Sequence, residues 1–331
     1  MISSWPRVKA RPMRIVFMGT PEFAVLSLEA LLRSDDSVVG VVTQPDRPKG
    51  RGQILVAAPV KLVCQRKGLP ILQPVKMKDP AFLEALRAWQ PDLIAVAAFG
   101  RILPKVILGM PPRGCVNVHA SLLPKYRGAG PIQWALINGE RETGITTMLM
   151  DEGMDTGAIL LQELVAIQPE DTAGSLAARL AEVGGRLLVE TIRRLKDGTV
   201  APRPQDHTQA TLAPLLKKED GLIDWKLAAV EIGNRVRGLS PWPGAYTYAG
   251  DDRWIIWRAA PAGRPPSTAI PGTIIEARKE GILVATGNGL LAITELQPVN
   301  SRRMGVAQYL AGHALLPGLV LGASPSPSTG G

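Results

Sequence analysis

Residues 14–22 of the chain read RIVFMGTPE. The first six are mostly apolar and end in glycine, a pattern typical of a buried strand. Thr20 can then cap a helix that has proline at its first position and an acid in its first turn, so we expect a helix to about Arg33. A second, valine-rich strand is expected at residues 38–42. Strand, helix and strand in this order predict a βαβ unit, and therefore a parallel sheet.

The same alternation continues to about residue 196. Further helices are predicted at residues 59–67, 79–89 and 172–196, and further strands at 70–72, 93–98, 115–119, 145–150 and 159–165. Shorter helical pieces begin near Leu103 and Ile132. These elements predict a Rossmann-like α/β domain with a parallel sheet over residues 13–200.

The composition changes after residue 200. Residues 201–217 contain several prolines and polar residues, which predicts an exposed linker. Beyond it we expect a helix at 227–238 and strands at 245–248, 254–258, 272–277, 282–285 and 290–296. Closely spaced strands separated by glycine and proline predict a small, OB-like β-barrel domain over residues 218–322. Residues 1–12 are expected to be an N-terminal extension, and residues 323–331 a disordered tail.

The overall composition limits the classes of partner. A net charge of +9 favours a polyanionic partner. Cys64 and Cys115 lie in apolar surroundings and form no CxxC pair, so we expect inert core thiols and a cytoplasmic location. No run approaches the roughly 18 apolar residues of a membrane-spanning helix, so no membrane contact is expected. We also expect a monomer.

A second informative stretch, residues 117–131, reads NVHASLLPKYRGAGP. Apolar residues lead into it, so it begins as a strand, and side chains alternate along a strand, so Asn117 and His119 share one face. An amide donor and a titratable imidazole therefore lie together at the carboxyl end of a strand. Ligands of open parallel sheets bind in the crevice outside these strand ends.

Several common kinds of site are excluded by what the sequence lacks. GxGxxG needs three glycines, and the turn after the first strand supplies only Gly19, which argues against a nicotinamide enzyme. No GxxxxGK[ST] motif occurs, so the phosphate-binding loop of nucleotide triphosphatases is absent from the sequence. The three histidines, His119, His207 and His313, are far apart with no ligands at metal spacing, so no metal site is expected.

Acidic residues cluster in the loop predicted between two later strands, residues 150–157. Such a loop is normally solvated, but a buried carboxylate there could orient an imidazole and interact with its charge. The spacing alone does not choose among Asp151, Glu152 and Asp155.

A basic loop follows the second strand. Residues 43–52 are long for a strand-to-helix connection, and they carry Arg47, Lys49 and Arg51. Two interpretations remain open, a mobile solvated loop and an arm that reaches a phosphate backbone, for which the planar guanidinium of arginine is suited. Trp242, between two prolines, likewise fits either a packed corner or a base-stacking platform.

Together these motifs resemble the methionyl-tRNA formyltransferases, over about residues 13–322. The resemblance lies in residues 19–24, 43–52, 98–100, 117–131, 151–157, 221–225 and 241–245. The Asn-x-His-x-Ser-Leu-Leu-Pro pattern is shared by the wider group of folate-dependent formyltransferases, which includes enzymes acting on glycinamide ribonucleotide and on sugar nucleotides. The basic loop and the C-terminal region indicate the tRNA-acting family. Phe99 stands where that family often has tyrosine.

The resemblance implies a reaction and its residues. It implies transfer of a formyl group from 10-formyltetrahydrofolate to the α-amine of methionyl initiator tRNA, without a metal. The implied catalytic residues are Asn117, His119 and Asp155. It further implies a folate site at Ser121, Leu122, Leu123 and Pro124, and tRNA contacts from Arg47, Lys49 and Arg51, with Arg51 the key residue.

Two alternative functions fit parts of the same pattern. A formyltransferase acting on an amino sugar nucleotide would share the site without needing the basic loop. A non-catalytic RNA-binding protein would keep the basic surface without needing Asn117, His119 and Asp155 together.

Overall fold

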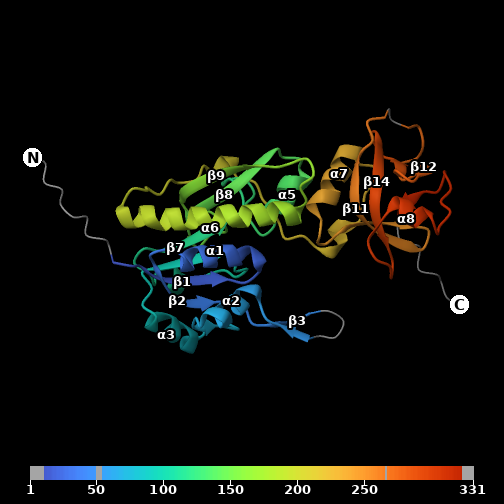
Figure 1. Ribbon diagram of the computed structural model, residues 1–331. Coiled ribbons are helices and arrows are strands. Elements are labelled where there is room, and N and C mark those ends of the chain that lie inside the picture. The colour runs from blue at the N-terminus through green and yellow to red at the C-terminus, as the bar shows by residue number, and fades with distance from the viewer. Residues whose placement is uncertain (1–10, 50–53, 265–266, 323–331) are drawn as a thin grey trace, which may run out of the picture. The chain divides into compact units, whose positions relative to one another are not determined.

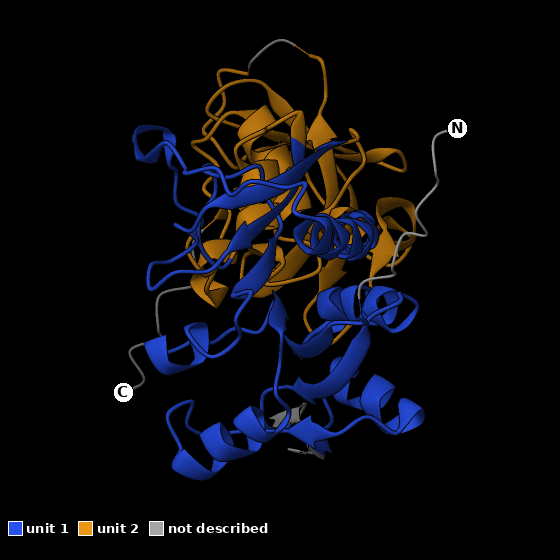
Figure 2. Ribbon diagram, turned by 90° about the vertical axis from the view of Figure 1, so that its left-hand side faces the viewer, with its two compact units in different colours: residues 1–129, 143–165, 177–213 blue, residues 130–142, 166–176, 214–331 orange. Residues whose placement is uncertain are grey.

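A computed structural model of the chain describes residues 11–49, 54–264 and 267–322 (Figure 1). The chain divides into two compact units (Figure 2). The first comprises residues 1–129, 143–165 and 177–213, and the second residues 130–142, 166–176 and 214–331. The second unit thus includes two short segments that precede residues 201–217, where we expected the domains to divide. The predicted N-terminal extension, apart from Arg11 and Pro12, and the predicted tail lie outside the described residues.

The main sheet has the strand order β5-β2-β1-β6-β7-β8-β9. Its strands are β1 (Arg14–Gly19), β2 (Ser37–Val42), β5 (Ile71–Leu72), β6 (Leu93–Ala97), β7 (Cys115–His119), β8 (Glu142–Leu149) and β9 (Ile159–Ala166). The five strands from β5 to β7 are parallel, as predicted, and β8 is antiparallel to β7. Every residue of β6 is buried, which is typical of a parallel sheet covered on both faces.

Helices cover the two faces of this sheet (Figure 1). They are α1 (Glu22–Leu32), α2 (Pro59–Lys67), α3 (Pro80–Ala88), α4 (Lys105–Leu108) and α6 (Ala173–Asp197). On one face, Phe82 of α3 belongs to an apolar cluster with Val16 and Val96. On the other face α6 packs closely against α1. A Cβ atom added to Gly185 would lie only 2.7 Å from the carbonyl oxygen of Leu26 in α1.

The start of α1 differs from the prediction. Pro21, rather than Thr20, is the N-cap residue, and no side chain caps this helix. The Thr20 hydroxyl instead accepts a hydrogen bond from the Gln44 N–H, at 3.2 Å. Thr20 therefore joins the end of β1 to the segment after β2, a tertiary contact that local capping rules do not anticipate.

The prediction that residues 201–217 form an exposed linker is wrong for several of them. Arg203 and Ile159 exchange two backbone hydrogen bonds of 2.8 Å, and the Ala213 N–H donates to the Arg127 carbonyl oxygen at 2.7 Å. Ala213 and Gln205 are buried. Arg203 and Ala213 thus satisfy backbone groups by pairing with Ile159 and Arg127, within the first unit.

The second unit contains an antiparallel sheet with the order β12-β13-β14-β11-β10-β16. Its strands are β10 (Ala245–Ala249), β11 (Asp252–Pro261), β12 (Ile274–Arg278), β13 (Gly281–Ala285), β14 (Leu290–Pro298) and β16 (Leu321–Gly322), with β15 (Met304–Gly305) beside β14. The sheet curls until its edges meet, since the Leu321 N–H donates to the Gly272 carbonyl oxygen at 2.8 Å. The predicted OB-like fold is confirmed, although β15, β16 and a short helix, α8 (Val306–Leu310), were not predicted.

Helices α5 (Pro131–Ile137) and α7 (Ala229–Gly238) pack together in this unit. A Cβ on Gly238 would lie 2.7 Å from the Cγ1 atom of Ile137, so glycine permits the close approach. Among the described residues, no helix is both long and apolar enough to cross a membrane.

Candidate active site

The candidate site lies at the carboxyl end of β7, close to the centre of the main sheet. Strand β1 has β2 on one side and β6 on the other, so the order of the strands reverses there, and β7 lies beside β6. Crevices at such reversals are where open α/β sheets bind ligands. The structure brings Asn117, His119 and the turn that follows them to this edge.

Asn117 places a side-chain amide at this edge. Its backbone pairs with Val96 in β6 and Met148 in β8, and its side chain is half-buried. Over residues 11–49, 54–264 and 267–322, no group forms a hydrogen bond with that side chain. A partly buried amide without a protein partner is available to a ligand.

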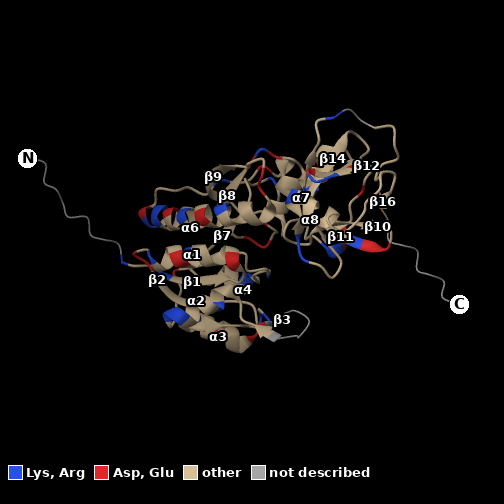
Figure 3. Ribbon diagram, turned by 45° about the vertical axis from the view of Figure 1, so that its right-hand side comes forward, with Lys and Arg blue, Asp and Glu red and all other residues tan. Residues whose placement is uncertain are grey.

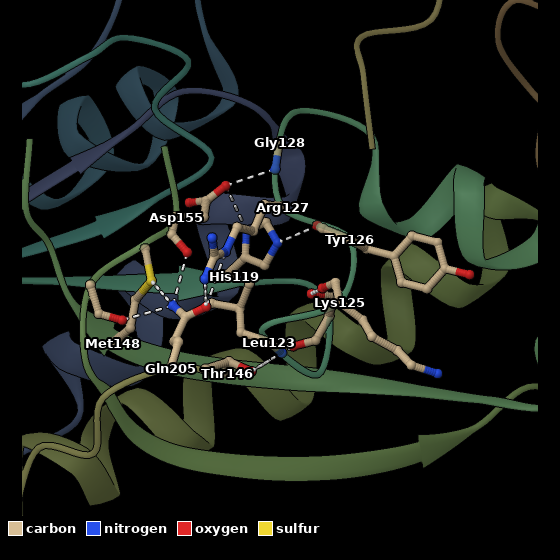
Figure 4. A network of polar contacts seen from close by, with 12 residues as sticks. His119, Leu123, Lys125, Tyr126, Arg127, Gly128, Thr146, Met148, Asp155 and Gln205 are labelled. Carbon is tan, nitrogen blue, oxygen red and sulfur yellow. Dashed lines mark hydrogen bonds and ion pairs between the residues drawn. The ribbon is translucent and has the colours of Figure 1, made fainter. Parts of the chain in front are cut away.

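His119, the last residue of β7, is held between two loops (Figure 4). Its Nε2 atom lies 2.8 Å from the carbonyl oxygen of Tyr126, and because a carbonyl can only accept, Nε2 carries a proton. Its Nδ1 atom faces Asp155 Oδ2 at 3.6 Å. Both ring nitrogens therefore point toward oxygen atoms, which fixes the orientation of the ring.

The structure distinguishes the three acids of the loop. Asp151 stabilises the loop itself, accepting hydrogen bonds from the Gly153 N–H at 3.0 Å and the Thr156 hydroxyl at 2.6 Å. Glu152 is exposed and pairs with Lys105 at 3.1 Å. The Asp155 side chain is only 16% exposed and also accepts the Gly128 N–H, at 2.9 Å. Of the three, Asp155 alone reaches His119.

The turn at residues 121–124 is fixed by its own hydrogen bonds. The Ser121 hydroxyl donates to the Lys125 carbonyl oxygen at 2.6 Å. Thr146 of β8 donates to the Ser121 carbonyl oxygen at 2.6 Å and accepts the Leu123 N–H at 3.1 Å. Gln162 Nε2 donates to the Leu123 carbonyl oxygen at 2.9 Å. Ser121 and Leu123 are buried, whereas Leu122 and Pro124 are half-buried, so the latter two can meet a ligand.

Two further residues near the site were missed by the sequence analysis. Arg127 and Gln205 are buried beneath the acidic loop and hydrogen-bond to each other (Figure 4). Arg127 Nη2 also lies 3.1 Å from His207 Nδ1. Gln205 belongs to the proline-rich segment interpreted as a linker, and nothing in its local sequence indicated this position.

The basic loop forms a β-hairpin, with Arg47 and Lys49 on β3 (Arg47–Lys49), which pairs with β4 (Ile54–Val56). Arg51 lies outside the described residues. Asp46 anchors the hairpin through Lys61, at 2.5 Å, and Gln73, at 2.9 Å, and these hydrogen bonds lower the pKa of its carboxyl group.

Several other basic residues form ion pairs with acids. Basic and acidic residues alternate along α6 (Figure 3), where Arg193 and Arg194 pair with Glu190 at 2.8 and 2.6 Å. These partners lower the pKa of Glu190 to about 2. Within the described ranges, no three His, Cys, Asp or Glu residues are grouped so that they could hold a metal ion.

The chain is similar to known formyl transferases. Residues 13–192 match the formyl transferase family, and residues 215–314 match the formyl transferase C-terminal domain. The methionyl-tRNA formyltransferase of Desulfotalea psychrophila is 51% identical, covering 94% of this chain and 96% of its own. That of Geobacter sulfurreducens is 49% identical, covering 95% and 98%.

Solved structures at lower identity share the fold. The N-formyltransferase from Helicobacter canadensis, in complex with folinic acid and dTDP-3-aminofucose, has a TM-score of 0.63 at 20% identity, covering 85% of this chain and 98% of its own. HypX from Aquifex aeolicus, in complex with tetrahydrofolic acid, has a TM-score of 0.61 at 19% identity, covering 90% and 47%. With two family matches and relatives of about half identity along nearly its whole length, the chain belongs to the methionyl-tRNA formyltransferase family.

Proposed function

We propose that the protein transfers the formyl group of 10-formyltetrahydrofolate to the α-amine of methionyl initiator tRNA, giving formylmethionyl-tRNA for translation initiation. Relatives with this activity in their names, matched along nearly the whole chain, support the tRNA acceptor. We further propose that it acts in the cytoplasm as a monomer, without a metal.

The observation that carries the proposal is that Asn117 and His119 lie two residues apart at the end of β7, with Asp155 facing His119 at 3.6 Å. An amine that attacks a formyl carbon forms a tetrahedral intermediate with negative charge on oxygen. Asn117, whose amide has no hydrogen-bond partner among the described residues, would donate to that oxygen. Donors fixed in advance at a developing oxyanion are among the largest contributions to catalysis.

His119 would manage the proton. The attacking amine must lose a proton and the folate nitrogen must gain one, and an imidazole can carry out both transfers once one ring nitrogen turns from its protein partner to the substrate. Asp155 would orient the ring and stabilise its positive charge. The separation of 3.6 Å between His119 Nδ1 and Asp155 Oδ2 is longer than a hydrogen bond, and such contacts often tighten when substrate binds.

The turn at Ser121, Leu122, Leu123 and Pro124 would line the folate site. Thr146 and Gln162 hold the backbone of the turn from behind, so its half-buried side chains are positioned before the co-substrate arrives. A prepared surface lowers the entropy lost on binding.

Arg47 and Lys49 of β3, together with Arg51, would contact the tRNA backbone. The β3–β4 pairing raises this basic segment on a ribbon separate from the main sheet. Guanidinium and ammonium groups bind phosphates with release of counterions, so tRNA binding is expected to weaken as salt increases.

Formylation by the purified protein tests the proposal. Charged initiator tRNA and a dTDP-linked amino sugar would be offered separately, each with 10-formyltetrahydrofolate, and the formylated product measured. We expect formylmethionyl-tRNA and no formylated sugar. Formylation of the sugar alone would favour the sugar-nucleotide alternative, and no transfer to either acceptor would contradict the assigned chemistry.

A further inference from the structure

Gln205 connects a buried arginine to the acidic loop. Its Oε1 atom accepts hydrogen bonds from Arg127 Nε at 3.1 Å and Nη2 at 2.6 Å. Its Nε2 atom donates to the carbonyl oxygens of Asp155, at 2.8 Å, and Gly157, at 2.7 Å. Gln205 is 7% exposed, so water contributes little to satisfying these groups. Figure 4 shows the side chain between Arg127 and the loop.

The orientation of this amide follows from its partners. A guanidinium can only donate hydrogen bonds, so it requires the amide oxygen on its side. The two carbonyl oxygens can only accept, so they require the NH2 group on theirs. Glutamine satisfies both sides at once, whereas a glutamate of the same shape would place an oxygen against the two carbonyls.

The backbone that Gln205 holds needs support. Asp155 has a φ angle of +53°, in the left-handed region that residues other than glycine seldom adopt. Such a conformation persists only when its surroundings fix it. Gln205 binds the loop through the backbone of Asp155, and the Gly128 N–H binds the Asp155 carboxylate at 2.9 Å. Together these bonds set the position from which the carboxylate faces His119.

We propose that Gln205 is a positioning residue for formyl transfer. It holds Asp155 where its carboxylate faces His119, and Arg127 fixes the direction of the Gln205 amide. The proposal rests on the catalytic roles proposed above for His119 and Asp155. Gln205 is buried and its side chain bonds to Arg127, Asp155 and Gly157, so we expect its loss to affect the catalytic step rather than the binding of either substrate.

Steady-state kinetics of the full chain test this assignment. Displacement of a catalytic group by about 1 Å can cost about 100-fold in rate, so we expect Gln205→Ala to lower kcat on the order of 10- to 100-fold. KM for tRNA and folate should be retained. Gln209→Ala is the matched control, because Gln209 is an exposed glutamine of the same segment that bonds only to Asp206 among the described residues, and it should behave like wild type.

Gln205→Glu provides a second variant. It keeps the volume and an ionic partner for Arg127, so it can be compared even where the alanine variant folds poorly. We expect the same loss of kcat, because the carboxylate cannot donate to the loop. Wild-type kcat in Gln205→Glu would overturn the proposal.

A double-mutant cycle separates positioning from general support of the fold. In an Asp155→Ala background there is no carboxylate left to position, so Gln205→Ala should lower kcat no further. Independent losses that multiply would overturn the proposal. Wild-type turnover in Asp155→Ala would overturn the proposed role of Asp155 together with this one. Loss in Asp155→Ala with wild-type turnover in Gln205→Ala would overturn only the role of Gln205.

Discussion

Asn117 and Ser121 are neighbouring polar residues that the fold uses differently. The Ser121 hydroxyl is fully buried and donates to the Lys125 carbonyl oxygen, so it maintains the turn. The Asn117 amide has no hydrogen-bond partner within the described ranges and is half-buried. A half-buried amide without a hydrogen bond contributes little to the stability of the folded protein, because a hydrogen bond to another protein group would stabilise the fold more. Its presence at the strand end is understandable if substrate supplies the partner.

At this scale we predict opposite consequences for the two residues. Asn117→Ala should lower kcat by roughly 100- to 1,000-fold, the usual cost of losing one oxyanion donor, without lowering thermal stability. Ser121→Ala should lower the free energy of unfolding by about 1 kcal/mol through its lost hydrogen bond. Kinetics and thermal unfolding of both variants measure these effects. Near-normal turnover by Asn117→Ala would exclude the oxyanion role.

Strands β3 and β4 pair with each other and are not part of the main sheet, so the function of this hairpin can be tested without altering that sheet. Its base is anchored by Asp46, and it carries exposed apolar residues, Leu55 at 68% and Val56 at 44%, beside the basic ones. Exposed apolar side chains in a segment that also carries basic residues are suited to a nucleic acid, which offers both phosphates and base faces.

For the basic loop, residues 43–52, we predict that Arg51→Ala raises KM for tRNA and leaves KM for folate unchanged. Removing one phosphate contact should also make binding less dependent on salt. Arg66→Ala, which removes an exposed charge from the end of the nearby helix α2, is the control for net charge and should have a smaller effect. Equal losses toward tRNA and folate would indicate that the loop is structural. KM measured at two salt concentrations distinguishes these cases.

At the scale of the whole molecule, burial determines the pKa and the reactivity of the two thiols. Cys64 and Cys115 are buried and unpaired in the first unit. Burial raises the pKa of Cys64 to about 11 and that of Cys115 to about 12, because the thiolate is poorly solvated there. This agrees with the inert thiols expected from sequence, since the thiolate is the reactive form.

We therefore predict that neither thiol reacts with DTNB at pH 8 until the protein unfolds. Both pKa values are raised above the unfolded value of about 9, so the thiols favour folding below that pH. Their contribution is lost as the pH rises from about 9 toward 11–12. Urea unfolding at pH 8 and pH 10 should show this loss, and it should be smaller in the Cys64→Ala/Cys115→Ala variant. Rapid labelling of the folded protein at pH 8 would contradict the prediction.

The sequence by itself predicted most helices and strands of the first unit in their order, and the strand end at which the candidate site lies. Strand β7 and helix α2 have the predicted limits, and the polar pair of β7 lies at a strand end as expected. Hydrophobic periodicity, proline and glycine act over a few residues, so their effects can be predicted locally.

The spacing of the acidic residues left Asp151, Glu152 and Asp155 open, and the resemblance pointed to Asp155. Only the tertiary structure showed that Asp155 faces His119, that part of the apparent linker is buried, and that Gln205 binds the acidic loop. These outcomes depend on contacts between segments far apart in sequence, such as His119 with Asp155 and Asp155 with Gln205. The identity of a residue and its neighbours in sequence do not predict such contacts, because the contacts form only when the sheet and its loops have packed.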